Sequence, residues 1–218
     1  NARDLVNIKL TLESVLSIKK EMAELTADLI KSIARMIKTS ASLVPLISFI
    51  DSHIVSEPPI SVREGKMIKE GISKELDKLR KIVNGSRDWI LTMEQQEREK
   101  TGIASLKVRY NQVFGFYIEV SKSNLDAVPV HYIRKQTLVN GERFITADLK
   151  KQEEIILTAE DRINELEYQL FQDVLQKVLD QVSFIQEAAK SIATLDCLLT
   201  FAQLAEQNRY VRPTILYS

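Results

Sequence analysis

Two short stretches decide the fold of this chain: LKVRYNQVFGFYIEVS at Leu106–Ser121 and QTLVNGERFIT at Gln136–Thr146. Polar and apolar residues alternate in both, and Tyr, Phe, Val, Ile and Thr dominate, which is typical of β-strands. Asn140-Gly141 predicts a tight hairpin, because both central residues of a type I′ turn take a positive φ. Asn111-Gln112 predicts a second tight connection before another strand.

We expect these strands to form an antiparallel sheet in which the two tight turns lie at the same end. The flanking helices would then both attach at the opposite end. The turns would be the distal tips of a small β module that is shaped to reach a partner.

The rest of the chain is predicted to be helical, since Gly (6) and Pro (5) are scarce among its 218 residues. Apolar residues recur every three or four positions from Ile68 to Met93, which predicts an outgoing helix of about 30 residues. The stretch from Leu149 to Ala205 contains neither Gly nor Pro. It predicts one returning helix, about 85 Å long if unbroken. Two such helices would pack antiparallel as a lever.

The expected fold class is therefore mainly α: a helical bundle and a long antiparallel helical lever, with a small inserted antiparallel β module. Apolar stripes predict three shorter bundle helices within the first 54 residues, with Pro45 in the first turn of the third. The expected domains are 1–103 for the bundle and outgoing helix, 104–147 for the β module, 148–207 for the returning helix and 208–218 for a connector.

The formal net charge of the chain is zero, which does not indicate a domain that coats nucleic acid over its whole surface. Residues 103–147 differ, because they contain six basic and only three acidic residues. This local excess favours a phosphate-bearing partner for the β module.

We find no catalytic or metal-binding pattern in the sequence. His53 and His131 have no Cys or carboxylate partners at metal-ligand spacing, and no GxxxxGK[ST] phosphate loop occurs. Cys197 is the only cysteine, so an intramolecular disulfide is excluded; its apolar surroundings predict a buried thiol in a reducing cytoplasm. No apolar run is long enough to span a bilayer, so no membrane partner is expected.

Several stretches resemble MutS-type DNA mismatch repair proteins. Residues 106–149 are similar to the clamp segment of that family, through YNQVFGFYIEV and RKQTLVNGERFIT. NARDL at 1–5, PPISVREGKMIKEGISKELDKLR at 58–80 and YVRPTI at 210–215 resemble its core opening, its connector into the lever and the segment before its ATPase domain. The chain departs from the family at four positions, where Arg109 often is Gly, Gly141 often is Ala, and Ala2 and Ala147 commonly are Pro.

The resemblance implies a lever and clamp fragment in which two subunits of a homodimer embrace duplex DNA. Clamps in this family touch the DNA backbone rather than the bases. A mismatch-reading domain would precede Asn1, and an ATPase domain binding ATP and Mg²⁺ would follow Ser218. The fragment itself would not be an enzyme and would hold no cofactor. The parent would be a cytoplasmic, nucleoid-associated bacterial DNA-dependent ATPase with a downstream repair protein as partner.

Matching the family pattern assigns DNA contact to Asn111, Gln112 and Asn140. Strands rise about 3.4 Å per residue, which places Arg109 and Arg143 within about 10 Å of a predicted tip and makes them the preferred cations. Lys107, Arg134 and Lys135 are secondary candidates. For Asn140 an alternative stays open, since Asn-Gly also suits a hairpin that binds nothing.

A second function is a scaffold arm whose β module docks a protein and does not bind DNA. It would require an exposed apolar patch at the tips, where the sequence places Asn, Gln and Gly.

Overall fold

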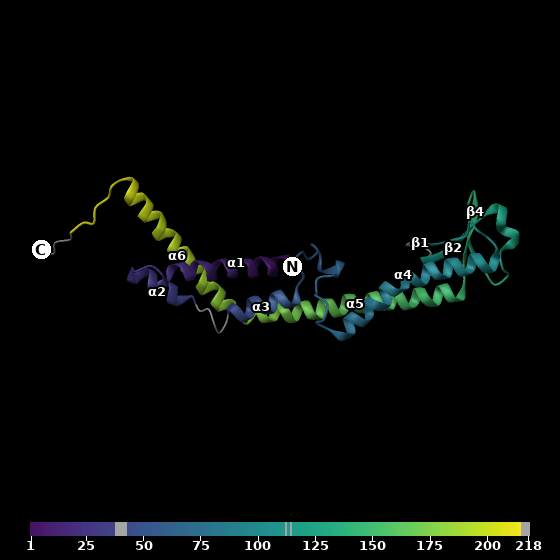
Figure 1. Ribbon diagram of the computed structural model, residues 1–218, viewed down its shortest axis with the longest axis horizontal. Helices are drawn as coiled ribbons and strands as arrows, with labels where there is room; N and C mark the ends of the chain where they lie inside the picture. Colours follow the sequence, from purple (N-terminus) through teal and green to yellow (C-terminus); the bar gives the residue numbers. More distant parts are fainter. Residues whose placement is uncertain (38–42, 112, 114, 215–218) are drawn as a thin grey trace. The chain divides into compact units, whose positions relative to one another are not determined.

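A computed structural model of the chain describes residues 1–37, 43–111, 113 and 115–214 (Figure 1). Helices form most of this part, and the strands make a single four-stranded antiparallel sheet, which confirms the expected fold class. The elements are α1 (Ala2–Met22), α2 (Asp28–Met36), α3 (Val44–His53), η2 (Val62–Glu64), α4 (Lys74–Thr101), β1 (Lys107–Asn111), β2 (Gly115–Ser121), η3 (Lys122–Ala127), β3 (Ile133–Thr137), β4 (Gly141–Ile145), α5 (Ala147–Leu179) and α6 (Val182–Gln207).

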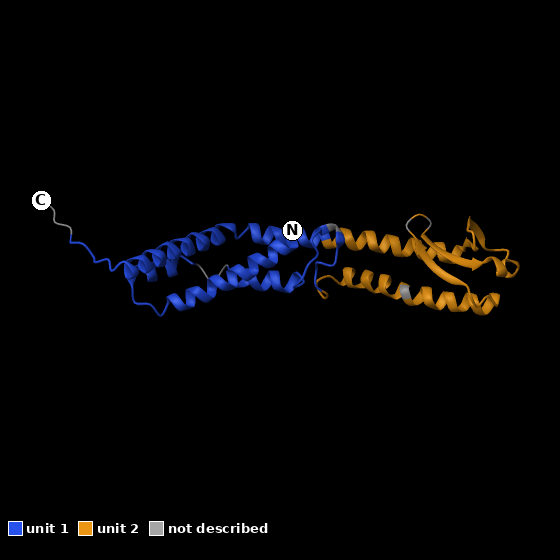
Figure 2. Cartoon of the chain, turned by 90° about the horizontal axis from the view of Figure 1, so that it is seen from above, with its two compact units in different colours: residues 1–69, 168–218 blue, residues 70–167 orange. Residues whose placement is uncertain are grey.

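The chain divides into two compact units, shown in separate colours in Figure 2. Unit 1 comprises residues 1–69 and 168–218, and unit 2 comprises residues 70–167. Unit 2 therefore contains α4, the sheet and the first two thirds of α5.

Unit 1 is a helical bundle whose start is set by local capping. The Asn1 side chain accepts a hydrogen bond from the Asp4 backbone, and the Asp4 side chain bonds back to the Asn1 amine, which forms a capping box for α1. Leu5 and Leu12 of α1 and Ile50 of α3 are buried in its core. Pro45 lies in the first turn of α3, as the sequence predicts.

Two details of the helices differ from the expectations. Ile68 does not start the outgoing helix but pairs with Ile54 in an isolated β-bridge, and α4 begins later, after its N-cap Ser73. The returning helix is not continuous, because α5 ends at Leu179 and α6 begins at Val182. The break falls at Asp180-Gln181, where the Gln181 backbone donates to the Val178 carbonyl at 3.0 Å, an i to i−3 bond of the tighter 3₁₀ type, and neither Gly nor Pro is present.

The expectation of a buried Cys197 is wrong. Its thiol is exposed on α6, although apolar residues flank it in sequence. Neighbours along a helix point to different sides, so the apolar run at residues 195–199 does not lie on one buried face.

In unit 2 the strands follow the order β1-β2-β4-β3. β2 pairs with both β1 and β4, and all three strand pairs are antiparallel. The β1–β2 turn therefore lies at one end of the sheet and the β3–β4 turn at the other, and the expectation of two turns at one end is wrong. Gly141 pairs with Ser121, at the end of β2 opposite the one where Gly115 pairs with Asn111.

The reason lies in the connection between β2 and β3. Residues 122–132 are too many for a tight hairpin and carry the chain back along the sheet, so that β4 rather than β3 pairs with β2. This connection begins with the 3₁₀ helix η3, which the sequence does not predict.

One face of the sheet packs on α4 and the start of α5. Ile118 and Val120 of β2 are fully buried there with Leu106 and Leu149, and Met93 of α4 covers them. Thr146 Oγ1 accepts a hydrogen bond from the Leu149 backbone at 3.2 Å and so caps the first turn of α5. The core thus joins the ends of both helices to one strand.

A buried carboxylate ties the β2–β3 connection to α4. Tyr132 Oη donates to Glu97 Oε2 at 2.6 Å, and Lys100 Nζ donates to Glu97 Oε1 at 2.8 Å. Burial alone would raise the pKa of the Glu97 carboxyl, but these two hydrogen bonds hold it below its ordinary value of 4.5.

Replacing Tyr132 with Phe removes one of these hydrogen bonds and keeps the ring. We expect the free energy of unfolding of unit 2 to fall by about 1–3 kcal/mol, the usual range for a buried hydrogen bond to a charged group. Urea titration followed by the fluorescence of Trp89, the only tryptophan, measures it. Tyr168→Phe, at an exposed tyrosine, is the control, and an equal loss in both variants would contradict the assignment.

The Glu97 carboxyl also predicts an acid dependence. Because its pKa is lower in the folded than in the unfolded chain, its contribution to stability is full above the unfolded value and is lost as pH falls through the folded value. The stability of unit 2 should therefore fall more steeply below about pH 4.5 in the wild type than in Glu97→Gln. Parallel curves for the two proteins between pH 6 and 3 would exclude this role.

Candidate nucleic-acid interface

The outer face of the sheet is the face turned away from the hydrophobic core. Along β1 it carries Lys107, Arg109 and Asn111, which alternate with the inward-packed Val108. Lys107 and Arg109 are exposed, and within the described residues neither has an ion-pair partner. β1 is an edge strand, so these two cations stand at the open border of the sheet.

Arg143 lies on the same face but is held by its neighbours. Its Nε donates to Glu119 Oε2 at 3.4 Å, and its Nη1 donates to Gln136 Oε1 at 2.8 Å. Its guanidinium also sits 4.4 Å from the centre of the Tyr117 ring. Arg143 is thus partly buried and holds neighbouring side chains of the outer face in place. Glu119 partly neutralises the charge of its guanidinium, so a ligand would meet less than a full positive charge there.

The structure does not bring the other two predicted cations into this group. Arg134 is paired with Phe144 in the ladder, which places it on the opposite face from Arg143, and its Nη1 forms an ion pair with Glu142 at 3.2 Å. Lys135 is exposed in the irregular part of β3, between Arg134 and Gln136. Both lie toward the β3 edge, with two strands between them and β1.

The two predicted polar contacts that the structure describes, Asn111 and Asn140, are not clustered either. Asn111 ends β1, and its Oδ1 accepts a hydrogen bond from the Val113 backbone at 3.0 Å; Gln112 lies outside the described residues. Asn140 is exposed in the turn at the other end of the sheet, where its carbonyl accepts from the Lys122 backbone at 3.1 Å. A ligand that touches both asparagines must lie along the outer face.

A groove of about 300 Å³ lies on this face beside Asn140. Its lining comes from three segments of the chain, at residues 105–109, 119–121 and 138–141. Next to it is a group of small polar side chains that the sequence analysis missed. Asn124 Nδ2 donates to Ser105 Oγ at 3.0 Å and to Ser121 Oγ at 3.1 Å. The groove is lined by Ser105, Lys107, Arg109, Glu119, Val120, Ser121, Leu138, Asn140 and Gly141.

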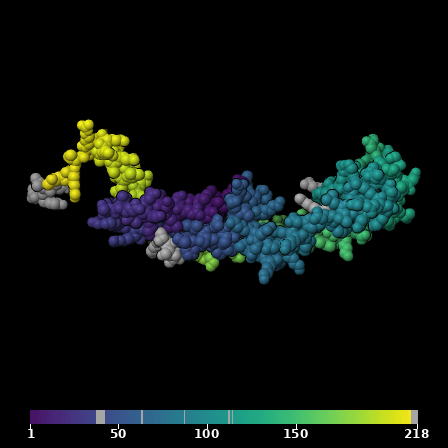
Figure 3. Space-filling model, viewed as in Figure 1, coloured from purple at the N-terminus to yellow at the C-terminus, as the bar shows by residue number. Residues whose placement is uncertain are grey.

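The charge of the outer face is positive. Three cations, Lys107, Arg109 and Arg143, share it with the single carboxylate of Glu119 in the described ladder. The side chains around the strands, teal in Figure 3, form one continuous lobe. Amides, hydroxyls and cations without a deep pocket suit the oxygens of a polyanion rather than a small substrate.

Apolar side chains at the turns bear on the scaffold alternative. Val113 and Val139 are highly exposed, and they lie at opposite ends of the sheet. The two turn valines are too far apart to join in one apolar patch, although Tyr110, Val130 and Ile133 of the same module are exposed as well.

No group of three or more His, Cys, Asp or Glu side chains that could hold a metal ion occurs in the described ranges. None of the described helices is both long and apolar enough to cross a membrane.

Two long helices with a small antiparallel sheet inserted between them define the class of this protein: a mainly helical arm with a β module. Residues 71–162 match the family described as MutS family domain IV. The chain is 48% identical over 215 residues to the DNA mismatch repair protein MutS of Halothermothrix orenii, covering 99% of this chain and 24% of that protein. It is 46% identical over 216 residues to the protein of that name from Methanosarcina barkeri, with the same coverage.

The DNA mismatch repair protein MutS of Myxococcus xanthus is 45% identical over 215 residues. The chain spans about a quarter of the length of these curated relatives. It is a segment of a MutS-type protein, as its strand and connector motifs predict.

The turn before β4 differs from the predicted type I′ hairpin. Neither Asn140 nor Gly141 has a positive φ; Leu138 N instead bonds to Gly141 O at 2.8 Å, and Gly141 begins the strand. A Cβ at this position would lie 2.4 Å from the Val120 carbonyl oxygen, so an alanine, which the family often has here, would fit only if β2 shifted away. Close approach of β2, rather than backbone conformation, explains this residue.

Gly141→Ala should therefore destabilise unit 2 by about 1–3 kcal/mol, because β2 must move to admit the methyl group. The matched control is Gly85→Ala within α4, where a Cβ would meet nothing within 4 Å. That control should stabilise the protein by about 0.5–1 kcal/mol through helix propensity. Urea denaturation of both variants tests the opposite signs, and a neutral Gly141→Ala would show that β2 is not so close.

Proposed function

We propose that the outer face of the β1-β2-β4-β3 sheet contacts the sugar-phosphate backbone of duplex DNA in a mismatch repair protein. The observation that carries this proposal is the edge strand β1, where Lys107 and Arg109 are exposed on the same face and lack ion-pair partners among the described residues. Exposed cations with no internal partner can neutralise phosphates without breaking a contact of the fold.

Spacing supports the same function. Residues two apart on a strand are separated by about 6.8 Å, which is comparable with the distance between neighbouring phosphates on one DNA strand. Asn111 continues the row by one more step. Such a row can follow a backbone, and it offers no arrangement for reading base edges.

We further propose that the fragment serves as lever and clamp of a longer homodimeric protein. ATP and Mg²⁺ would bind in an ATPase domain outside these residues, since this sequence contains no phosphate loop. The relatives named DNA mismatch repair protein MutS support this, because each is about four times as long as the matching segment. α4 and α5 would then link DNA contact to that domain, and a downstream repair protein would engage the assembly.

Lys107→Gln and Arg109→Gln should each weaken duplex binding and reduce the slope of log affinity against log salt by about 1. The thermal midpoint should not change, since neither side chain supports the fold. Fluorescence anisotropy of a labelled duplex at several salt concentrations measures both quantities. Lys177→Gln, at an exposed lysine of α5, is the matched control.

Arg143→Gln should behave differently, because it removes the contacts to Glu119 and Gln136 and the stacking on Tyr117. We expect it to lower stability as well as affinity. Matched and mismatched duplexes should bind equally to this chain. A preference for the mismatch, or salt-independent binding, would contradict a backbone contact, and intact folding without any binding would favour the scaffold function.

A further inference from the structure

Two ion pairs join α4 and α5 within unit 2, at the end remote from the sheet. Arg80 Nη2 donates to Glu167 Oε1 at 2.6 Å, and Arg162 Nε donates to Glu75 Oε1 at 3.1 Å. Glu167 is completely buried, whereas both side chains of the second pair are largely exposed. A charge so deeply buried is costly unless it is paired, so its presence calls for a reason other than stability.

The two pairs cross. α4 leads toward the sheet and α5 leads away from it, so in this antiparallel arrangement a step forward on α4 corresponds to a step back on α5. On α4, Arg80 lies five residues after Glu75. If the two pairs were level with each other, the partner of Arg80 on α5 would lie about five residues before Arg162. Its partner, Glu167, instead lies five residues after Arg162. The axial offsets of the two pairs therefore differ by ten residues, or about 15 Å. The two side chains of one pair are too short to span all of that offset, so it is shared between the pairs. Going from α4 to α5, one pair therefore slants toward the sheet and the other slants away from it.

Because the two pairs slant in opposite directions, they resist sliding of the helices in opposite directions. If α5 slides along α4 in one direction, one pair is stretched; if it slides in the other direction, the other pair is stretched. A shift of one helical turn, about 5.4 Å, exceeds what a hydrogen-bonded ion pair tolerates. Asp77 strengthens the arrangement, since its Oδ1 lies 3.8 Å from Arg80 Nη1 and its Oδ2 accepts from the Gly71 backbone at 2.9 Å.

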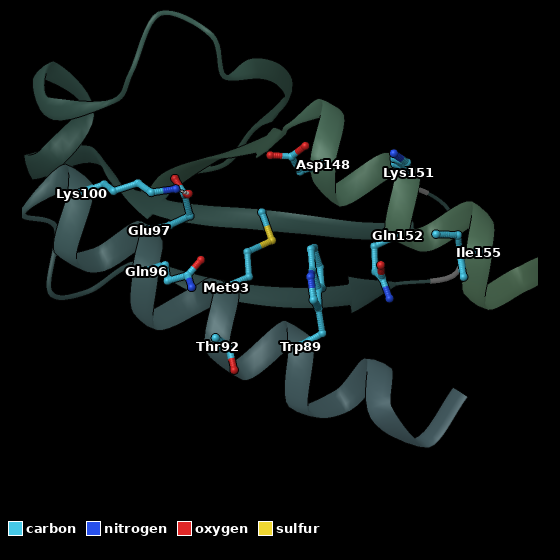
Figure 4. A pocket seen from close by; sticks show the side chains of 10 residues that line it. All are labelled: Trp89, Thr92, Met93, Gln96, Glu97, Lys100, Asp148, Lys151, Gln152 and Ile155. Carbon is cyan, nitrogen blue, oxygen red and sulfur yellow. Dashed lines mark hydrogen bonds and ion pairs between the residues drawn. The ribbon is translucent and has the colours of Figure 1, made fainter. Parts of the chain in front are cut away.

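Nearer the sheet, the two helices do not interlock. They enclose a cleft of about 510 Å³, in which the side chains of Trp89, Met93 and Ile155 leave open space between α4 and α5 (Figure 4). Gln152 Nε2 reaches Ser86 Oγ across it at 3.3 Å, a single long hydrogen bond between neutral groups. Direct contact between the helices is therefore looser here than at the two ion pairs.

We propose that the crossed ion pairs Arg80–Glu167 and Glu75–Arg162 set the axial register of α4 against α5, and through it the tilt of the sheet that both helices carry. The sheet attaches to α4 through Gly102 and to α5 through Thr146, so a slip between the helices must tilt or shear it. The buried pair acts as a register device in the way that buried polar groups do in other helical assemblies. This proposal concerns the fold of unit 2 and does not depend on DNA binding.

Spin labels test the register directly. In the 218-residue chain with Cys197→Ser, labels are attached at Gln95→Cys and Glu160→Cys, which are exposed on α4 and α5. Their axial offset makes the distance between them sensitive to sliding. Double electron–electron resonance should give one narrow distance in this background.

Arg80→Met/Glu167→Leu replaces the buried pair with apolar side chains, and unfolding should be no easier than in the background. The distance distribution should nevertheless broaden and include a population displaced by about one helical turn, about 5.4 Å. Adding Glu75→Gln/Arg162→Gln should broaden it further. Arg80→Glu/Glu167→Arg, which restores an ion pair, should narrow it again.

Two further variants serve as controls. Glu75→Gln/Arg162→Gln alone changes only exposed side chains, so it will fold even if the buried variant does not, and it should permit a shift in one direction only. Lys9→Met/Asp51→Leu removes an ion pair of unit 1 and should leave the distance unchanged. A narrow, unshifted distribution in the variant that lacks both crossed pairs would overturn the proposal.

Discussion

The pairing of β2 with both β1 and β4 is the constraint on which unit 2 depends. β1 follows α4 and β4 precedes α5, so this one strand ties the ends of the two helices together through backbone hydrogen bonds. Its inward residues, Ile118 and Val120, are also the fully buried centre of the core. Since β2 carries both the central hydrogen-bonded pairings and the centre of the core, separating the sheet from either helix would break strand pairing and expose core residues together.

The same strand separates two chemical environments. On its inner side apolar residues are buried, and the buried carboxylate of Glu97 there accepts hydrogen bonds from Tyr132 and Lys100. On its outer side Glu119 holds Arg143 in place, while the cations of β1 remain open. The outer face can thus offer charge to a polyanion and keep its shape, since the residues that organise it are not those that would meet the ligand.

Which site residues could be found from sequence depends on how local their roles are. Lys107 and Arg109 follow from strand alternation, because two residues apart on one strand always share a face. The contacts that hold Arg143 could not be predicted from the sequence, since Glu119, Gln136 and Tyr117 reach it from other strands. The polar group around Ser121 depends likewise on the path of the β2–β3 connection.

The sequence by itself determined the types of the main helices and strands, which follow from the period of apolar residues, and local signals such as Pro45 in the first turn of α3, which act within a few residues. Only the tertiary structure decided that β4 pairs with β2 and that Gly141 serves a close approach rather than a positive φ. These outcomes depend on contacts between residues distant in sequence, whose energies differ little between alternative pairings until the whole core is assembled.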